Sequence, residues 1–221
     1  MTIGIVGGTG PAGSGLAVRL AAAGHEVLLG SRDPDKATQR VAELQAKWDD
    51  RVATMRGVAN VDAAQADAVV LATVADSVLA TAIDLAAVLD GRVVVCMANL
   101  LTRVERGFAA VLPEGGSVAV NVQQAVPGAR VVGAFQNLPA RALAELDQPI
   151  AADVVVCGDD AEAVSTIVDL TATIDGLHPF DGGPLVNAAA IEALTAVLLT
   201  VNRARKAEHG IRLVDLRAKL G

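Results

Sequence analysis

Three glycines near the start of the chain carry its clearest chemical signal. Gly8, Gly10 and Gly13 have the spacing G-x-G-x-x-G, directly after an apolar run at residues 3–6 and directly before a helical stretch. Glycine permits the tight turn, lets the backbone approach a pyrophosphate and lets the helix pack on the strand. Backbone N–H groups at the start of the helix would face the phosphates. The alternative is a generic glycine-rich turn, but the strand-turn-helix context favours a dinucleotide-binding loop, made of Gly8, Thr9, Gly10, Pro11, Ala12 and Gly13.

The next apolar run ends at residues that could select between NAD and NADP. Ser31 lies 18 residues past Gly13, where an NAD-dependent enzyme usually carries Asp or Glu to hold the ribose 2′-hydroxyl. Ser31 and Arg32 instead offer a hydroxyl and a guanidinium suited to a 2′-phosphate, and Lys36 adds a second positive charge. The alternative is that Arg32 and Lys36 belong to a solvated helix face. The pattern predicts NADP.

The elements that must position these residues alternate between short apolar runs and alanine-rich helical stretches. Continuous apolar runs are typical of strands buried on both faces, as in a parallel sheet covered by helices. The sequence therefore predicts an α/β fold with a doubly wound parallel sheet, a Rossmann-like NADP-binding domain at residues 1–174 and a small C-terminal helical appendage at 175–221. The expected strands are residues 3–6, 27–29, 68–72, 93–96, 130–134 and 154–157. The expected helices are residues 12–23, 34–47, 77–88, 104–112, 161–174 and 185–208.

Composition excludes several functions. The chain of 221 residues has no tyrosine, three phenylalanines and one tryptophan, so phenol chemistry and aromatic platforms for nucleic acid are not expected. A formal net charge of −7 also disfavours a nucleic-acid partner. Two distant cysteines predict neither disulfides nor a metal site. The start of the chain shows no signal peptide, and the apolar stretch at 188–201 contains Glu192 and is shorter than the roughly 20 residues a membrane span needs. We therefore expect a soluble cytoplasmic protein.

Motifs along almost the whole chain resemble a known family. They are Gly7-Gly8-Thr9-Gly10 with Gly13, Gly24-His25-Glu26-Val27, Gly30-Ser31-Arg32, Asn137-Leu138-Pro139-Ala140, Val156-Cys157-Gly158-Asp159-Asp160, Ile174-Asp175-Gly176-Leu177, Gly183-Pro184-Leu185 with Asn187, Glu192-Ala193-Leu194-Thr195 and Gly210-Ile211. With these motifs the chain resembles the NADPH-dependent coenzyme F420 reductases, also called F420:NADP oxidoreductases. Many dehydrogenases share the glycine loop, whereas the motifs of the C-terminal half are more particular to this family.

The resemblance implies reversible hydride transfer between the nicotinamide and the deazaflavin of coenzyme F420. Such a reaction needs positioning rather than a catalytic nucleophile, base or metal, and we expect none. Around NADP the resemblance places the loop from Thr9 to Ala12, Ser31, Arg32, Lys36, Thr73 and Val74. Around the deazaflavin it places Asn137, Leu138, Pro139, Ala140, Thr195, Gly210 and Ile211. The backbone N–H groups of residues 137–140 and the Thr195 hydroxyl are the candidate hydrogen-bond donors. Family analogy also predicts a homodimer, with the helix at 188–201 as a core element or a dimer contact.

Three positions depart from the family pattern. Gln136 stands where a histidine is usual, and Ala189 and Ala193 stand where an arginine and a serine are usual. The resemblance to the family remains despite these three differences, but they make the identity of the second substrate less well defined. The alternatives are an NADPH-dependent reductase of a small imine or carbonyl substrate, which would need a proton donor, and a non-catalytic NADP-sensing protein. The sensor would not need the C-terminal deazaflavin motifs.

Overall fold

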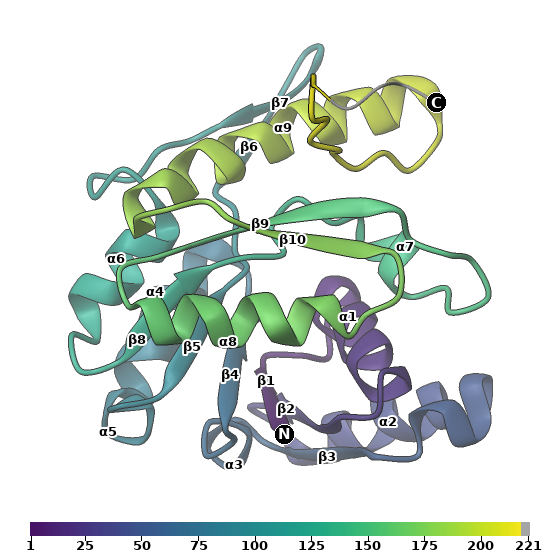
Figure 1. Ribbon diagram of the computed structural model, residues 1–221. Coiled ribbons are helices and arrows are strands. Elements are labelled where there is room, and N and C mark those ends of the chain that lie inside the picture. Colours follow the sequence, from purple (N-terminus) through teal and green to yellow (C-terminus); the bar gives the residue numbers. More distant parts are fainter. Residues whose placement is uncertain (218–221) are drawn as a thin grey trace.

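A large twisted sheet forms the centre of the protein in the computed structural model, which describes residues 1–217 (Figure 1). Its strand order is β10-β9-β8-β5-β4-β1-β2-β3. All neighbours pair in parallel except β8 and β9, which pair antiparallel through Val132 with Gly158 and Gly133 with Cys157. The strands are β1 (Thr2–Val6), β2 (Glu26–Ser31), β3 (Met55–Ala59), β4 (Ala68–Leu71), β5 (Val93–Cys96), β8 (Arg130–Gly133), β9 (Ala152–Gly158) and β10 (Leu177–Asp181).

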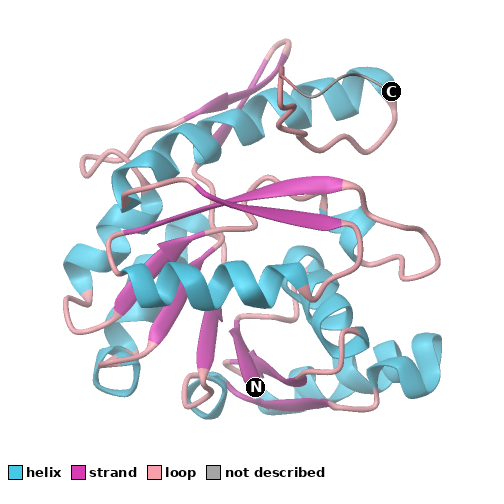
Figure 2. Cartoon of the chain, viewed as in Figure 1, coloured by secondary structure: helices cyan, strands magenta, loops and turns pink. Residues whose placement is uncertain are grey.

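Helices cover both faces of this sheet, which confirms the expected doubly wound fold (Figure 2). The helical elements are α1 (Pro11–Ala22), α2 (Pro34–Trp48), η1 (Asp49–Val52), α3 (Asn60–Ala63), α4 (Ala75–Asp84), α5 (Ala86–Leu89), α6 (Val118–Ala125), α7 (Ala140–Leu143), α8 (Ala161–Ala172), η2 (Leu185–Asn187) and α9 (Ala188–Arg205). Alternate residues of each central strand serve two cores. In β5, Val93 and Val95 join the core under α1, α2 and α8, whereas Val94 and Cys96 join the core under α4, α5 and α6. The continuous apolar runs of the sequence follow from this burial on both faces.

One expected helix is wrong. Residues 104–112 do not form a helix but belong to a hairpin of β6 (Leu101–Val104) and β7 (Gly107–Ala110) that packs against α9. Gly107 has a φ of 137°, which a helix does not allow, and a Cβ there would lie 2.4 Å from the Thr200 Oγ1 of α9. The Phe108 N–H donates to the same hydroxyl at 3.0 Å. Contacts distant in sequence therefore fix this hairpin.

Other elements also differ from the expected ones. The sequence did not predict the helix α6 or the strands β3 and β10. Strand β10 occupies one edge of the main sheet and contains Pro179, which an edge strand tolerates because one side of it needs no ladder bond. The sheet thus continues past residue 174, and the helical part of 175–221 begins only at Leu185. The expected helix at 77–88 is two helices, α4 and α5.

The last helix is longer than the apolar stretch that predicted it. The segment Leu185–Arg205 has 21 residues and is long and apolar enough to cross a membrane by length and composition alone, whereas the expected apolar stretch covers only residues 188–201. Its inner face nevertheless serves the globular fold. Ala188, Glu192, Thr195 and Ala196 are buried, and Glu192 accepts hydrogen bonds from the backbone of α6.

Candidate functional site

The glycine loop between β1 and α1 has no room for side chains where the chain folds back on itself. A Cβ on Gly8 would lie 2.6 Å from Leu29 Cδ1, and one on Gly13 would lie 2.8 Å from the Gly8 Cα. Gly7 adopts a φ of 68°, and its N–H donates to the Asn60 Oδ1 at 3.0 Å. At Gly10, by contrast, a Cβ would meet nothing within 4 Å. The loop therefore packs tightly at Gly8 and Gly13 and is open at Gly10, as a phosphate-binding loop requires.

A polar cavity of about 340 Å³ opens beside this loop. It brings together residues far apart in sequence: Thr9, Gly10, Ser31, Arg32, Lys36, Asn60, Thr73, Val74, Ser77 and Thr81 are among those that line it. Every residue predicted to contact NADP beyond the loop thus lies at one site. Asn60 at the start of α3, and Ser77 and Thr81 in α4, were missed because single polar residues in helices carry no distinctive sequence signal.

The end of β2 shapes the part of this cavity that holds the positive charges. Ser31 is 8% exposed, and its Oγ accepts a hydrogen bond from the Asp33 N–H at 3.1 Å. Asp33 caps α2 by accepting from the Asp35 N–H at 3.2 Å, and it lies 3.6 Å from the Lys36 Nζ. Arg32 is exposed at the cavity lining. Asp33 therefore caps α2 and also lies beside Lys36. Arg32 is then the principal cation that remains for an anionic ligand.

A second, more apolar cavity of about 380 Å³ adjoins the first. The two share Gly10, Ala72, Thr73 and Val74, so they meet at the carboxyl ends of β1 and β4. The second cavity is also lined by Pro11, Ala12, Ala75, Met97, Ala98, Asn99, Leu101, Phe135, Gln136, Leu138, Pro139, Ala140, Thr195 and Leu199. Its position at the carboxyl ends of the strands is where open α/β sheets bind their ligands.

Three residues that line this second cavity carry buried polar atoms without partners. Within residues 1–217, Thr73 Oγ1, Asn99 Oδ1 and both amide atoms of Gln136 have no hydrogen-bond partner. Gln136 is only 3% exposed, so its amide is shielded from solvent. The preceding residue, Phe135, is buried in left-handed backbone with a φ of 67°, which is unusual for a bulky side chain. Unpaired buried groups and a strained backbone at one cavity fit a site that is completed by a polar ligand.

The structure gives a different account of the expected hydrogen-bond donors. The Thr195 Oγ1 lies 3.1 Å from the carbonyl oxygens of Gln136 and Ile191, so its hydrogen is directed to the backbone. The Leu138 N–H donates to the Phe135 carbonyl, and Pro139 has no N–H. Of the four residues 137–140, only Asn137 and Ala140 keep a candidate N–H.

Three residues predicted from the resemblance lie outside the second cavity lining. Asn137 is 3% exposed, and its Nδ2 donates to the Asp153 carbonyl at 2.9 Å. The Ile211 carbonyl accepts from the Asp153 N–H at 2.9 Å, which ties the C-terminal segment to β9. Gly210 lines a smaller neighbouring cavity of about 240 Å³, which shares Leu138 and Pro139 with the second cavity. These residues therefore hold the segments that surround the site.

Glu192, which interrupts the apolar helix and begins one of the motifs of the resemblance, has a definite place in the structure. Its carboxylate accepts from the N–H groups of Val118 at 2.8 Å and Ala119 at 3.1 Å, at the start of α6. It is 4% exposed; burial raises its pKa, and these two hydrogen bonds lower it by a smaller amount. Glu192 thus joins α9, which carries Thr195, to the core of the sheet domain.

The fold, the glycine loop and the two adjoining cavities are those of the doubly wound, dinucleotide-binding class of proteins. Residues 2–100 match the family model described as "NADP oxidoreductase coenzyme F420-dependent". The F420-dependent NADP reductase of Methanocaldococcus jannaschii is 36% identical over 98% of this chain and 99% of its own length. That of Methanothermobacter marburgensis is 33% identical over 98% of this chain and 99% of its own. The chain belongs to the family of F420-dependent NADP reductases.

Solved structures share this fold, and one of them is described with the family's activity. A protein from Arthrobacter sp. FB24, described as a candidate F420-dependent NADP reductase, superposes with a TM-score of 0.80 at 27% identity, over 96% of this chain and 100% of its own. A hypothetical protein from Sinorhizobium meliloti gives a TM-score of 0.70 at 29% identity, over 87% and 90% of the two chains. An imine reductase from Streptomyces aurantiacus shares the fold at 17% identity, with a TM-score of 0.62 over 93% and 64%.

Proposed function

We infer that this protein catalyses reversible hydride transfer between NADPH and the deazaflavin coenzyme F420. The observation that carries the inference is the meeting of a polar cavity and an apolar cavity at Gly10, Ala72, Thr73 and Val74. A nucleotide with anionic groups suits the first cavity, and a flat ring system suits the second. Two rings bound in this way can reach each other across the shared residues, with only small side chains around them.

The overall reaction is NADPH + F420 + H⁺ giving NADP⁺ and reduced F420, so two electrons and one hydrogen move as hydride and one proton comes from solvent. The bound coenzymes supply this chemistry, and the protein binds and orients them and excludes water. Positioning is therefore the main contribution of the side chains. The residues that line the two cavities include neither cysteine nor histidine.

For NADP, we assign binding of the pyrophosphate to the glycine loop, which consists of Gly8, Thr9, Gly10, Pro11, Ala12 and Gly13. Arg32 supports binding of the 2′-phosphate because its guanidinium can donate two parallel hydrogen bonds. Lys36 adds charge, and Ser31 adds a hydroxyl whose oxygen already accepts from the backbone of Asp33. Thr73 and Val74, on both cavity walls, would flank the nicotinamide.

For F420, Leu138, Pro139 and Ala140 offer an aliphatic surface on which a ring can lie. Thr195 acts through the backbone, because its hydroxyl meets the carbonyl of Gln136 at the cavity wall. We assign Asn137, Gly210 and Ile211 to the surrounding frame, which keeps the 138–140 segment against β9. Asn99 and Gln136 line this cavity and carry polar atoms without partners, so we assign them as the polar residues nearest the ring edges.

The decisive test mixes the purified protein with NADPH and oxidised F420 and follows the loss of deazaflavin absorbance. We expect turnover with NADPH and much less with NADH. Arg32→Ala serves as the matched variant, and it should still turn over at saturating NADPH. Tight NADP binding without any loss of deazaflavin absorbance would contradict the proposed function.

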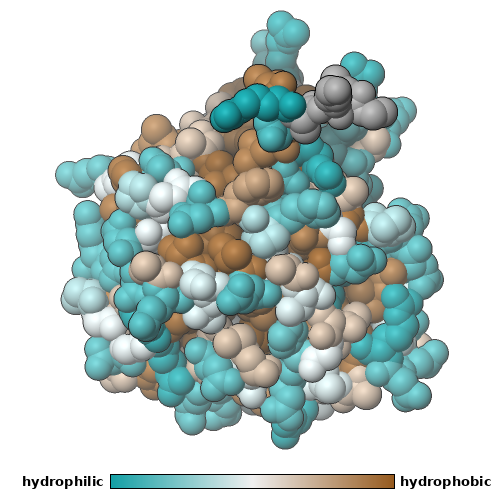
Figure 3. Space-filling model, viewed as in Figure 1, coloured by the Kyte–Doolittle hydropathy of each residue, from teal (hydrophilic) through white to brown (hydrophobic). Residues whose placement is uncertain are grey.

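We also propose that the protein is a soluble cytoplasmic homodimer. The outer side of α9 supports a dimer, because Val197 is 56% exposed and Val201 is 36% exposed on this helix. In Figure 3 apolar residues gather around the middle of α9, among polar ones. The inner side of the same helix, with Glu192 bound to α6, supports a place in a soluble fold.

A further inference from the structure

The segment that begins at Pro139 lines the second cavity but has little structure of its own. It contains the four-residue helix α7 and then turns through residues 144–149 before β9 begins. A helix this short is not stable by itself, because one turn gains few hydrogen bonds for the backbone it orders. Contacts with the rest of the protein must therefore hold Pro139 and Ala140 in place.

Arg19 of α1 provides the central contact. Its side chain is 7% exposed, and its Nε donates to the Leu143 carbonyl at 3.1 Å. Its Nη2 lies 2.8 Å from the Ala142 carbonyl and 2.9 Å from that of Gln148, and it also bonds to the Glu145 carbonyl. One guanidinium thus donates hydrogen bonds to four backbone carbonyls within the seven residues 142–148. Hydrogen bonds to a charged donor of this kind are stronger than neutral ones.

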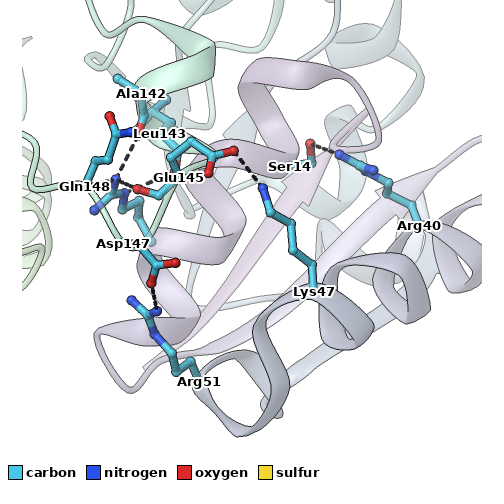
Figure 4. A network of polar contacts seen from close by, with 10 residues as sticks. Ser14, Arg40, Lys47, Arg51, Ala142, Leu143, Glu145, Asp147 and Gln148 are labelled. Atoms are coloured by element: carbon cyan, nitrogen blue, oxygen red, sulfur yellow. Dashed lines mark hydrogen bonds and ion pairs between the residues drawn. The ribbon is translucent and has the colours of Figure 1, made fainter.

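Two cations from the α2 region strengthen this arrangement at the surface (Figure 4). The Lys47 Nζ lies 2.6 Å from the Glu145 Oε1. The Arg51 Nη1 lies 2.7 Å from the Asp147 Oδ1, and its Nη2 donates to the Leu146 carbonyl at 2.9 Å. All of these contacts join the first 51 residues of the chain to residues 142–148.

A separate observation fixes the distance between α1 and α7. A Cβ added to Gly15 would lie 2.8 Å from Leu143 Cβ, 3.1 Å from the Ala140 carbonyl oxygen and 3.3 Å from the Ala144 nitrogen. The two helices therefore meet at their backbones, and any side chain at position 15 would push them apart. Gly15 lies only two residues past Gly13, the last glycine of the nucleotide loop.

We propose that α1, through Gly15 and Arg19, sets the separation between the two coenzyme-binding segments. The start of this helix supplies Pro11 and Ala12 to the cavity wall, and its middle holds the segment that supplies Pro139 and Ala140 to the same cavity. Gly15 and Arg19 are positioning residues that touch neither coenzyme. This inference rests on the proposed function, because hydride transfer requires the two reacting carbons at a closely defined distance.

Gly15→Ala tests the spacing. We expect the single-turnover rate of hydride transfer to fall at least about tenfold, because misplacement by a fraction of an ångström is costly in such steps. The isotope effect with NADPH deuterated at C4 should become larger or more temperature-dependent. The Kd for NADP⁺, measured by calorimetry, should change less than about twofold because the nucleotide loop is unaltered. A rate and isotope effect equal to those of the wild type would overturn the proposal.

Arg19→Lys tests the clamp in a second way that needs no coenzyme. Lysine keeps the charge but cannot reach four carbonyls at once, so backbone hydrogen exchange should rise across residues 140–148 and stay unchanged in β1 and β4. Unchanged exchange in that segment would contradict the role of Arg19. If either buried variant fails to fold, the surface double variant Lys47→Ala/Arg51→Ala should give a smaller increase in the same segment.

Leu89→Ala is the matched control for loss of stability. Leu89 is fully buried in α5, in the other core of the sheet, away from α1 and α7. The substitution should lower the melting temperature and leave the isotope effect and the backbone hydrogen exchange of residues 140–148 unchanged. If Leu89→Ala also changed the isotope effect or the exchange of this segment, the effects would come from a general loss of stability, and the proposal would be overturned. If the wild type itself fails to reduce F420, the proposed function falls, whereas the exchange results still test the clamp.

Discussion

Arg32 is the residue whose substitution should most directly change coenzyme preference. Arg32→Ala removes the guanidinium from the polar cavity, and we expect NADP binding to weaken by roughly 1.5–3 kcal/mol, one to two decades in Kd. Binding of NAD should hardly change because it carries no 2′-phosphate. Calorimetric titration with both nucleotides measures this. Lys36→Ala is the comparison, with a smaller expected loss because Lys36 is already close to Asp33. Equal losses for both nucleotides would contradict the assignment.

Gln136 should show opposite effects on stability and on coenzyme binding. Its amide is buried without a partner, so Gln136→Leu should raise the unfolding free energy of the free protein by roughly 1–3 kcal/mol. The same change should raise the KM for F420, because a ligand would lose its polar partner. Gln123→Leu is the control, since the Gln123 amide is bonded to Ala129 and Val131 and its removal should only destabilise. Urea unfolding and initial rates measure the two effects. A destabilised Gln136→Leu protein with an unchanged KM would refute this account.

At the scale of single residues, the sequence predicted some members of the candidate site and misplaced others. The glycine spacing and the polar pair Ser31 and Arg32 were readable because both sit in a local strand-turn-helix context. Asn137 and Ile211 were expected at the ligand, yet both are bound to Asp153 of β9. No local pattern distinguishes a polar residue that faces a ligand from one that braces the segment beside it.

Among the elements, α9 should give the protein a characteristic pH dependence through Glu192. Burial raises the pKa of this carboxyl above its ordinary value of 4.5, so the folded protein holds the proton more tightly than the unfolded chain. Its contribution to stability is therefore full below pH 4.5 and is lost as the pH rises through the raised pKa. We expect the unfolding free energy of the wild type, relative to Glu192→Gln, to fall between pH 4.5 and neutrality.

Urea unfolding at a series of pH values measures this difference. Glu114→Gln, at an exposed position in a loop, controls for the loss of one negative charge. A difference between wild type and Glu192→Gln that stays constant or grows with pH would contradict the prediction.

The elements differ in how far their own sequences define them. The strands of the sheet centre were predictable because burial on both faces leaves an uninterrupted apolar run. The hairpin at 101–110 was misread as a helix because Gly107 and the Thr200 hydroxyl of α9 determine its shape. Strand β3 was missed because Arg56 and Gly57 break its apolar pattern, although Gly57 is required there: a Cβ would lie 2.3 Å from the Thr38 nitrogen.

For the whole molecule, the proposed homodimer places the outer face of α9 at the contact between the two subunits. Val197→Glu places a charge on an exposed apolar position of this helix, so we expect the homodimer to dissociate while the monomer remains folded. Light scattering coupled to size exclusion measures the mass. Ile83→Glu, a similarly exposed apolar position on α4, should remain dimeric. A wild type that is monomeric at all concentrations, or a dimeric Val197→Glu protein, would refute the proposed interface.

The small residues where the two cavities meet have a kinetic consequence. The walls contain no cysteine, and the chain's two cysteines are buried elsewhere, where burial raises the pKa of Cys96 to about 12 and that of Cys157 to about 11. No side chain there can store a pair of electrons between two half-reactions. Both substrates must therefore be bound together before either changes. Double-reciprocal plots of initial rate against NADPH, at several F420 concentrations, should converge to a common point, and parallel lines would contradict a ternary complex.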